Sequence, residues 1–210
     1  MDKILVFGDS IAYGKWDSKG GWVARLRNYI DTTYNLNKEG NVQVYNLGIP
    51  GEVVPRLAER FSSELTMRTF PSEKNLVIVA CGINDSCPNN WMTDKQTDVE
   101  EFKAAYRKMI TIARDHECEI VAIGVTPINT EKSKRLLFSN EEVKKYDDII
   151  KDICEENGVR MLHLFDELLK VDFARLLVDA VHPNDEGHEV LYRKIKDFLF
   201  KNNVAELGGH

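Results

Sequence analysis

Three residues of the chain have the types needed for nucleophilic catalysis. Ser10 follows the first apolar run, and Asp179 and His182 stand three residues apart near the other end of the chain. A serine hydroxyl becomes a strong nucleophile when a neighbouring imidazole takes its proton. A carboxylate that accepts from the other ring nitrogen fixes the imidazole tautomer and stabilises its charge. The sequence therefore offers a nucleophile, its base and a residue that orients the base.

Each of these residues also has a structural interpretation. Ser10 after Gly-Asp is typical of a helix N-cap, and for this residue alone that role would be favoured. Asp179 could likewise be a cap, with His182 on the surface. The catalytic interpretation gains weight because Ser10 and the pair near the other end both fall where the carboxyl edge of a predicted sheet should lie. Open α/β sheets place their sites at that edge.

Two further residues could stabilise negative charge beside the nucleophile. Gly48 follows the second β-rich run and could present an unshielded backbone N–H, while Asn84 follows the third run and carries an amide. With the Ser10 N–H they make three donors, the arrangement that an acyl-transfer transition state requires. Individually, Gly and Asn are more often turn residues.

Short β-rich runs alternate with longer amphipathic stretches along the chain. The predicted strands are residues 3–7, 42–47, 76–80, 120–125 and 159–164, and the predicted helices are residues 21–34, 52–65, 98–116, 140–157 and 185–202. Such alternation predicts an α/β fold in which helices cover both faces of a mostly parallel sheet. We expect a three-layer αβα, flavodoxin-like arrangement with five strands.

Composition narrows the class of protein. The chain has 210 residues and a net charge of −6, which argues against a nucleic-acid surface. It has no apolar run long enough for a signal peptide or a membrane span, so we expect a cytoplasmic protein without stable membrane association. We expect one domain over residues 1–207, with a frayed tail at 208–210, and free thiols at the four cysteines.

Four sequence blocks resemble those of the SGNH hydrolases, the GDSL-type lipase/esterase family. In order, they are GDSIAYG at residues 8–14, NLGIPGE at 46–52, GIND at 82–85 and DAVHPN at 179–184. The resemblance covers nearly the whole chain, and each of the first three blocks stands at the end of a predicted strand. The chain departs from the family pattern at Ala180, often Gly, and at His188, where an aromatic is common.

The resemblance implies a role for each of the residues already singled out. Ser10 would be the nucleophile, His182 the general base and then acid, and Asp179 the residue that orients it. The Ser10 N–H, Gly48 and Asn84 would form the oxyanion hole. This chemistry needs no cofactor and no metal.

Two loops follow predicted strands and could form the walls of a substrate site, residues 86–96 and 129–139. Among the aromatic residues near strand ends, we expect Tyr13 and Trp91 to contact substrate. Asp9 precedes the nucleophile, and we expect its side chain to brace the turn by hydrogen bonding.

The expected function is hydrolysis of carboxylic esters through an acyl-enzyme on Ser10. The loops are polar and charged, which favours short acyl or acetyl esters of a soluble alcohol or sugar over a lipid interface. A lysophospholipase, a thioesterase or an acyltransferase on the same scaffold stays open, because fold does not decide substrate. A binding domain without catalysis is the alternative from another class. The oligomeric state is unknown from the sequence.

Overall fold

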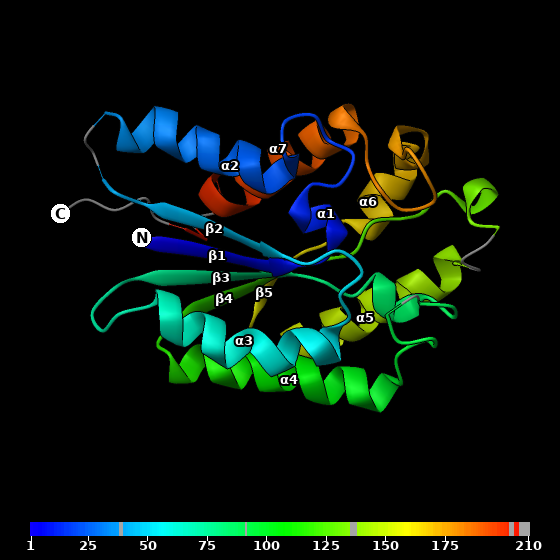
Figure 1. Ribbon diagram of the computed structural model, residues 1–210, viewed down its shortest axis with the longest axis horizontal. Coiled ribbons are helices and arrows are strands. Elements are labelled where there is room, and N and C mark those ends of the chain that lie inside the picture. The colour runs from blue at the N-terminus through cyan, green and yellow to red at the C-terminus, as the bar shows by residue number, and fades with distance from the viewer. Residues whose placement is uncertain (38–39, 91, 135–137, 202–203, 206–210) are drawn as a thin grey trace.

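Five parallel strands form the centre of the molecule (Figure 1). The computed structural model describes residues 1–37, 40–90, 92–134, 138–201 and 204–205. The strands are β1 (Lys3–Gly8), β2 (Gln43–Gly48), β3 (Asn75–Ala80), β4 (Glu119–Ile123) and β5 (Arg160–Leu162), in the spatial order β2-β1-β3-β4-β5. This is the flavodoxin-like order, in which ligands bind beyond the carboxyl ends of the strands where the order reverses. Here that point lies between β1 and β3.

Helices cover both faces of the sheet (Figure 1). On one face, α2 (Gly21–Ile30) lies beside α7 (Asp185–Lys201). On the other face lie α3 (Val54–Arg68), α4 (Val99–Asp115) and α5 (Asn140–Glu156). Because both faces are covered, the central strands are apolar apart from their first residues, and all six residues of β1 are buried.

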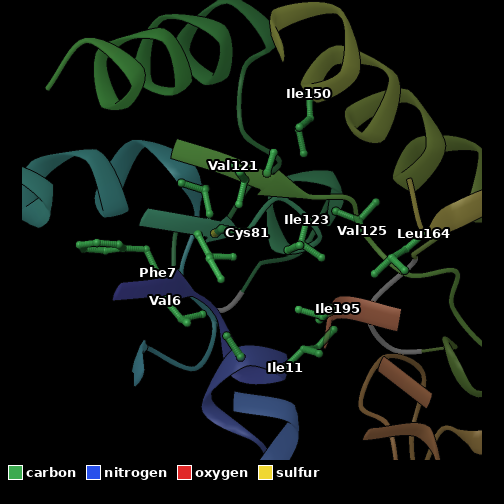
Figure 2. Close-up of a cluster of buried hydrophobic side chains, with 14 of the residues drawn as sticks. Val6, Phe7, Ile11, Cys81, Val121, Ile123, Val125, Ile150, Leu164 and Ile195 are labelled. Carbon is green, nitrogen blue, oxygen red and sulfur yellow. The ribbon is translucent and has the colours of Figure 1, made fainter. Parts of the chain in front are cut away.

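The packed core joins the sheet to these helices. Figure 2 shows Val6 and Phe7 of β1 and Val121 of β4 among the buried side chains. The rings of Phe7 and Phe61 lie 4.4 Å apart between centroids, which fixes α3 against the sheet. The four cysteines, Cys81, Cys87, Cys118 and Cys154, are buried, and none of them forms a disulfide bond.

The predicted fold class is confirmed, and every predicted strand and helix has its counterpart in the structure. The sheet is parallel throughout rather than mostly parallel. Several short elements were not predicted, among them α6 (Phe165–Lys170) and the 3₁₀ helix η4 (Phe173–Leu176). The predicted helix 21–34 ends as a regular α-helix at Ile30 and continues as a π-helical turn, η1 (Asp31–Asn35). One domain over residues 1–207 stays a prediction, and the tail at 208–210 lies outside the described residues.

Candidate active site

Ser10 lies on a sharp turn at the end of β1. It begins the four-residue helix α1 (Ser10–Tyr13), and Asp9 caps that helix by accepting from the Ile11 N–H at 2.9 Å. A Cβ atom on Gly8 would stand 2.5 Å from the Ala80 carbonyl oxygen and 2.6 Å from the Ala12 Cβ. Only glycine therefore allows the chain to leave the strand and fold back over the sheet edge at this point.

Asp9 braces this turn, as expected from its position before Ser10. Its side chain is buried. Burial raises the pKa of Asp9 to about 6, although its hydrogen bond from Ile11 and the nearby His182 act in the opposite direction.

The structure brings Ser10, His182 and Asp179 together. The Ser10 Oγ lies 2.8 Å from the His182 Nε2, across 172 residues of sequence. On the other side of the ring, the His182 Nδ1 lies 2.7 Å from Oδ2 and 2.9 Å from Oδ1 of Asp179. This geometry orients the imidazole with one nitrogen facing the serine hydroxyl.

The local turn explains why Asp179 can reach His182. The Val178 N–H donates to the His182 carbonyl at 2.8 Å, and Leu177 and Pro183 pair as an isolated antiparallel bridge. We call residues 177–183 the Asp179/His182 turn. Within it, Oδ1 of Asp179 also accepts from the backbone N–H of Val181 at 2.9 Å and of His182 at 2.8 Å.

These donors keep the carboxylate of Asp179 ionised. Partial burial alone would raise its pKa. The hydrogen bonds from the His182 side chain and from the backbone N–H groups of His182 and Val181 outweigh burial, and they hold the pKa of Asp179 well below its usual range. A permanently charged carboxylate is the form that stabilises a protonated imidazole.

Asn84 lies in the same pocket as Ser10 and His182. Its Nδ2 donates to the Glu52 carbonyl at 3.1 Å, and its own backbone carbonyl accepts from the Asn90 Nδ2 at 2.9 Å. An amide NH₂ group has two hydrogens, so one stays available to a ligand. Asn90 is buried and fixes the position of Asn84, a contribution that the sequence analysis missed.

Gly48 is paired in register with Gly8 of β1, next to α1. A Cβ atom at Gly48 would lie 2.5 Å from the Tyr13 N, so the close approach of α1 requires glycine here. Its N–H already donates to the Oδ1 of Asn46 at 3.0 Å. A role for Gly48 in an oxyanion hole stays a prediction, and it requires this N–H to be shared with the ligand.

A pocket of about 250 Å³ opens beside Ser10. Its lining residues are Ser10, Lys15, Pro50, Gly51, Asn84, Cys87, Asn89, Asn90, Phe138, Asp179, Val181 and His182. Cys87, Asn89 and Asn90 come from the first predicted wall and Phe138 from the second, so both loops do line the site. Tyr13 is not among these residues and its side chain is exposed. Trp91 lies outside the described residues.

A second, more open depression of about 660 Å³ lies along the Asp179/His182 turn. It is lined by Glu131, Lys132, Lys134, Asp179, Ala180, Val181 and His182. Lys132 is fixed in this place because its Nζ donates to the Leu177 carbonyl at 2.7 Å. His182 thus lies between a small pocket and a wider open surface.

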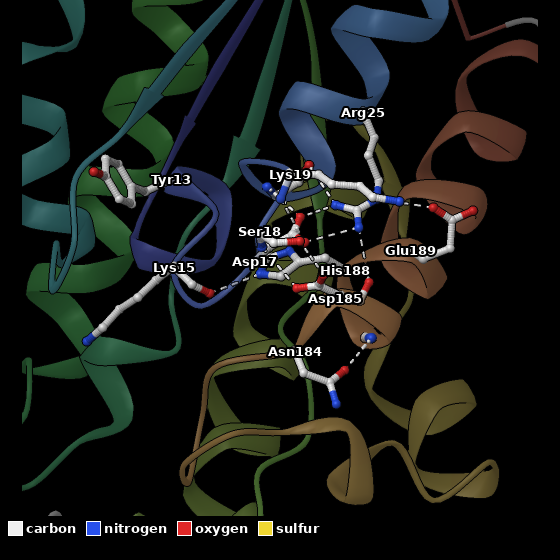
Figure 3. A network of polar contacts seen from close by, with 12 residues as sticks. Tyr13, Lys15, Asp17, Ser18, Lys19, Arg25, Asn184, Asp185, His188 and Glu189 are labelled. Atoms are coloured by element: carbon white, nitrogen blue, oxygen red, sulfur yellow. Dashed lines mark hydrogen bonds and ion pairs between the residues drawn. The ribbon is translucent and has the colours of Figure 1, made fainter.

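His188, where the family resemblance suggests an aromatic residue, is fully buried behind the site. Burial lowers the pKa of His188, and its Nε2 donates to the Lys15 carbonyl at 3.2 Å (Figure 3). The carboxylate of Asp185 accepts from Ser18 instead of facing His182. Within the described ranges, no three His, Cys, Asp or Glu side chains form a group that could hold a metal ion.

Similar proteins share this architecture. The acetyl xylan esterase AlAXEase is 20% identical, with a TM-score of 0.76, and the match covers 94% of this chain and 100% of that one. Axe2, an acetylxylan esterase from Geobacillus stearothermophilus, is 22% identical, with a TM-score of 0.74 and coverage of 95% and 94%. The lipase/acylhydrolase from Enterococcus faecalis is 19% identical, with a TM-score of 0.75 and coverage of 96% and 97%. At these identities the likeness shows the fold alone.

Two more comparisons concern the sequence and its helices. No curated protein sequence matches the chain. Among the residues that the structure describes, no helix has the length and apolar character needed to cross a membrane. The sequence model of the GDSL-like lipase/acylhydrolase family matches residues 6–190, a range that contains all four blocks from Gly8 to Asn184. The chain therefore belongs to the GDSL-like lipase/acylhydrolase family and is an ester hydrolase that acts on a small-molecule ester.

Proposed function

We propose that this protein is a serine esterase that removes short acyl or acetyl groups from a soluble alcohol or sugar, through an acyl-enzyme on Ser10. The observation that carries the proposal is the distance of 2.8 Å between the Ser10 Oγ and the His182 Nε2. On its other side, the same ring contacts the ionised Asp179. A serine in this environment can lose its proton to the imidazole as it attacks.

The reaction proceeds in two steps. The Ser10 Oγ attacks the ester carbonyl while the His182 Nε2 takes its proton, and the new oxyanion accepts from the Ser10 N–H and the Asn84 amide. His182 then gives the proton to the leaving alcohol as the carbonyl re-forms. A water molecule repeats the attack on the acyl-enzyme, with His182 again as base, and releases the acid and free Ser10.

The size of the pocket supports a short acyl group. Its volume of about 250 Å³ lies below the roughly 300–1,000 Å³ typical of drug-sized ligands. Its walls include apolar side chains such as Phe138 and the amides of Asn84 and Asn89. The open depression along the other side of His182 provides space for the alcohol half. Two similar structures carry acetyl xylan esterase names, which is in keeping with an acetyl ester.

The test is hydrolysis of p-nitrophenyl esters from acetate to decanoate by wild type and by Ser10→Ala. We expect the wild type to cleave the shortest esters fastest. We expect the variant to lose at least about 10³-fold in kcat while keeping the same melting temperature, because the nucleophile is gone and the fold is not. Equal rates for the two proteins would rule out Ser10 as nucleophile.

The same assay distinguishes hydrolysis from acyl transfer. An acceptor alcohol or sugar is added and the products are separated. If more acylated acceptor than free acid is formed, the enzyme is a transferase. If decanoate is cleaved faster than acetate, the substrate is a long-chain ester and the short-acyl assignment is wrong.

A further inference from the structure

Trp16 contacts the carboxylate of Asp179 from outside the Asp179/His182 turn. Its indole Nε1 donates to Oδ2 of Asp179 at 3.1 Å, across 163 residues of sequence. The other donors to this carboxylate, Val181 and His182, belong to the turn itself. Among the described residues, Trp16 is the single side chain that links Asp179 to the segment following the nucleophile.

We propose that Trp16 is a positioning residue, which fixes Asp179 so that Asp179 in turn orients His182 toward Ser10. The inference rests on the proposed function, because it assumes that Asp179 orients the base. Trp16 does not line the pocket beside Ser10, and its ring lies at the surface with 54% of the residue exposed. Its effect on catalysis therefore passes through Asp179.

The carboxylate of Asp179 needs such a partner on its outer side. Its side chain is 45% exposed, whereas that of His182 is only 15% exposed. The two oxygens are not equivalent, because Oδ1 accepts from two backbone N–H groups and Oδ2 accepts from none of those described. Oδ2 lies 2.7 Å from the His182 Nδ1 and also accepts from the Trp16 N–H, so the indole is its second partner and restrains the carboxylate from the outer side.

The backbone at Trp16 adopts a conformation that must itself be stabilised. Trp16 has a φ of +68°, which is unusual for a residue with a side chain. Gly14, two residues earlier, has a φ of +93°, and its Cα packs directly against the backbone of Gly20 and Gly21. We call residues 14–20 the Trp16 loop; it is closed tightly at its base and presents the indole at its tip.

Buried charges hold the Trp16 loop against α2. Asp17 and Arg25 form an ion pair whose side chains are 0% and 8% exposed, and the second oxygen of Asp17 lies 3.1 Å from the Arg25 Nη2. Asp17 also accepts from the Gly21 N–H at 2.7 Å. A buried ion pair with several hydrogen bonds specifies one arrangement of the chain, because each unpaired charge would be costly.

The same loop is joined to the start of α7 (Figure 3). The Ser18 N–H donates to the Asp185 carboxylate at 2.9 Å, and the Arg25 Nη2 donates to the Asp185 carbonyl at 3.1 Å. The Lys15 carbonyl accepts from the buried His188. Because α7 begins three residues after His182, these contacts fix the Trp16 loop and the Asp179/His182 turn to the same helix end. The indole therefore meets Asp179 at a set position.

The test is Trp16→Phe, which removes the N–H donor and keeps an aromatic side chain with the same backbone preferences. We expect kcat for p-nitrophenyl acetate to fall about fivefold, the usual effect of one lost hydrogen bond, with KM unchanged.

A second measurement is the rate constant for the reaction of Ser10 with a fluorophosphonate, which should fall by the same factor. In that reaction the Ser10 Oγ displaces fluoride from phosphorus and His182 takes the proton, so no ester substrate is required. Rates are normalised to the amount of probe bound at completion, which counts correctly folded sites.

The matched control is the same change in an Asp179→Ala background. If Trp16 acts through Asp179, Trp16→Phe has no further effect there, within the roughly twofold limit of additivity. A fivefold loss in both backgrounds, or no loss in either, would overturn the inference. Failure of the proposed function gives a different result. If the wild type does not react with the fluorophosphonate and Ser10→Ala does not slow ester hydrolysis, both proposals are wrong. A reactive wild type with an insensitive Trp16→Phe removes only this one.

Discussion

Asn84 enters the pocket with one of its amide hydrogens already used. The bond to the Glu52 carbonyl at 3.1 Å fixes the amide plane, and the bond from Asn90 to its backbone fixes the chain. Charge stabilisation in a transition state depends on donors that need no rearrangement when the charge develops. The single N–H of Gly48 is hydrogen-bonded to Asn46, whereas the Asn84 amide keeps a second hydrogen, so we propose Asn84 as the main oxyanion donor besides the Ser10 N–H.

Replacing Asn84 by Ala tests this assignment. We expect kcat to fall about 100-fold, the usual cost of one lost oxyanion donor, while KM changes little because the ground-state carbonyl gains less from that donor. Asn84→Asp has nearly the same shape but brings a negative charge toward the oxyanion, so its loss should be at least as large. The measurement is steady-state hydrolysis of p-nitrophenyl acetate. An Asn84→Ala enzyme with the wild-type kcat would remove Asn84 from the oxyanion hole.

At the scale of the elements, the position of Ser10 depends on the contact between α1 and the carboxyl ends of β1 and β3. Gly8 is the residue that permits this contact, since a Cβ would meet the Ala80 carbonyl oxygen at 2.5 Å. Backbone atoms on a central strand cannot move aside without breaking the sheet. We expect Gly8→Ala to displace Ser10, with a loss of both stability and activity.

A comparison with Gly158→Ala separates the two costs of replacing a glycine, which are backbone strain and steric overlap of the new Cβ. Gly158 has a φ of +62° and open space around its Cβ position, so its replacement costs only the strained backbone, about 1 kcal/mol. The φ of Gly8 is not in the left-handed region, so the cost at Gly8 is steric. Thermal unfolding and ester hydrolysis check both variants. We expect Gly158→Ala to keep full activity, and an active, stable Gly8→Ala would contradict this account of α1.

The elements also show what the sequence could and could not predict. The strands were predictable because β1 and β3 are buried on both faces and are therefore apolar after their first residues, Lys3 and Asn75. The blocks placed Ser10 just after β1 and Asn84 just after β3, which is where the structure has them. The short helix α6 was missed because six residues are too few to show an amphipathic helical pattern, and three of the six are charged. The Trp16 loop could not be foreseen, because its conformation depends on the pairing of Asp17 with Arg25 and of Ser18 with Asp185.

Across the whole molecule, buried carboxyl groups gather at the carboxyl edge of the sheet. Asp9 follows β1, Asp85 follows β3, and Asp147 of α5 contacts the end of β4 through the Val125 N–H. Burial raises the pKa of all three, to about 6 for Asp9 and Asp147. Residues that organise this edge thus lower the free energy of unfolding at neutral pH, and the packing of the rest of the fold offsets this loss.

Asp147 gives a direct test of this cost, because it lies away from Ser10 and its side chain is buried. Its pKa of about 6 exceeds the ordinary value of 3.8, so between these pH values the folded state binds more protons than the unfolded state. Its contribution to stability is therefore complete below pH 4 and is lost as pH rises through 6.

The variant Asp147→Asn tests this pH dependence. Its amide oxygen can still accept from the Val125 N–H, but the side chain no longer titrates. We expect the free energy of unfolding of the variant, relative to wild type, to rise by roughly 1–3 kcal/mol between pH 4 and pH 7.5. Urea unfolding at the two pH values measures this change. The titrations of Asp9 and Asp85 cancel in the difference, because both proteins contain these residues. A difference that is the same at both pH values would mean that Asp147 titrates alike in the folded and unfolded chains.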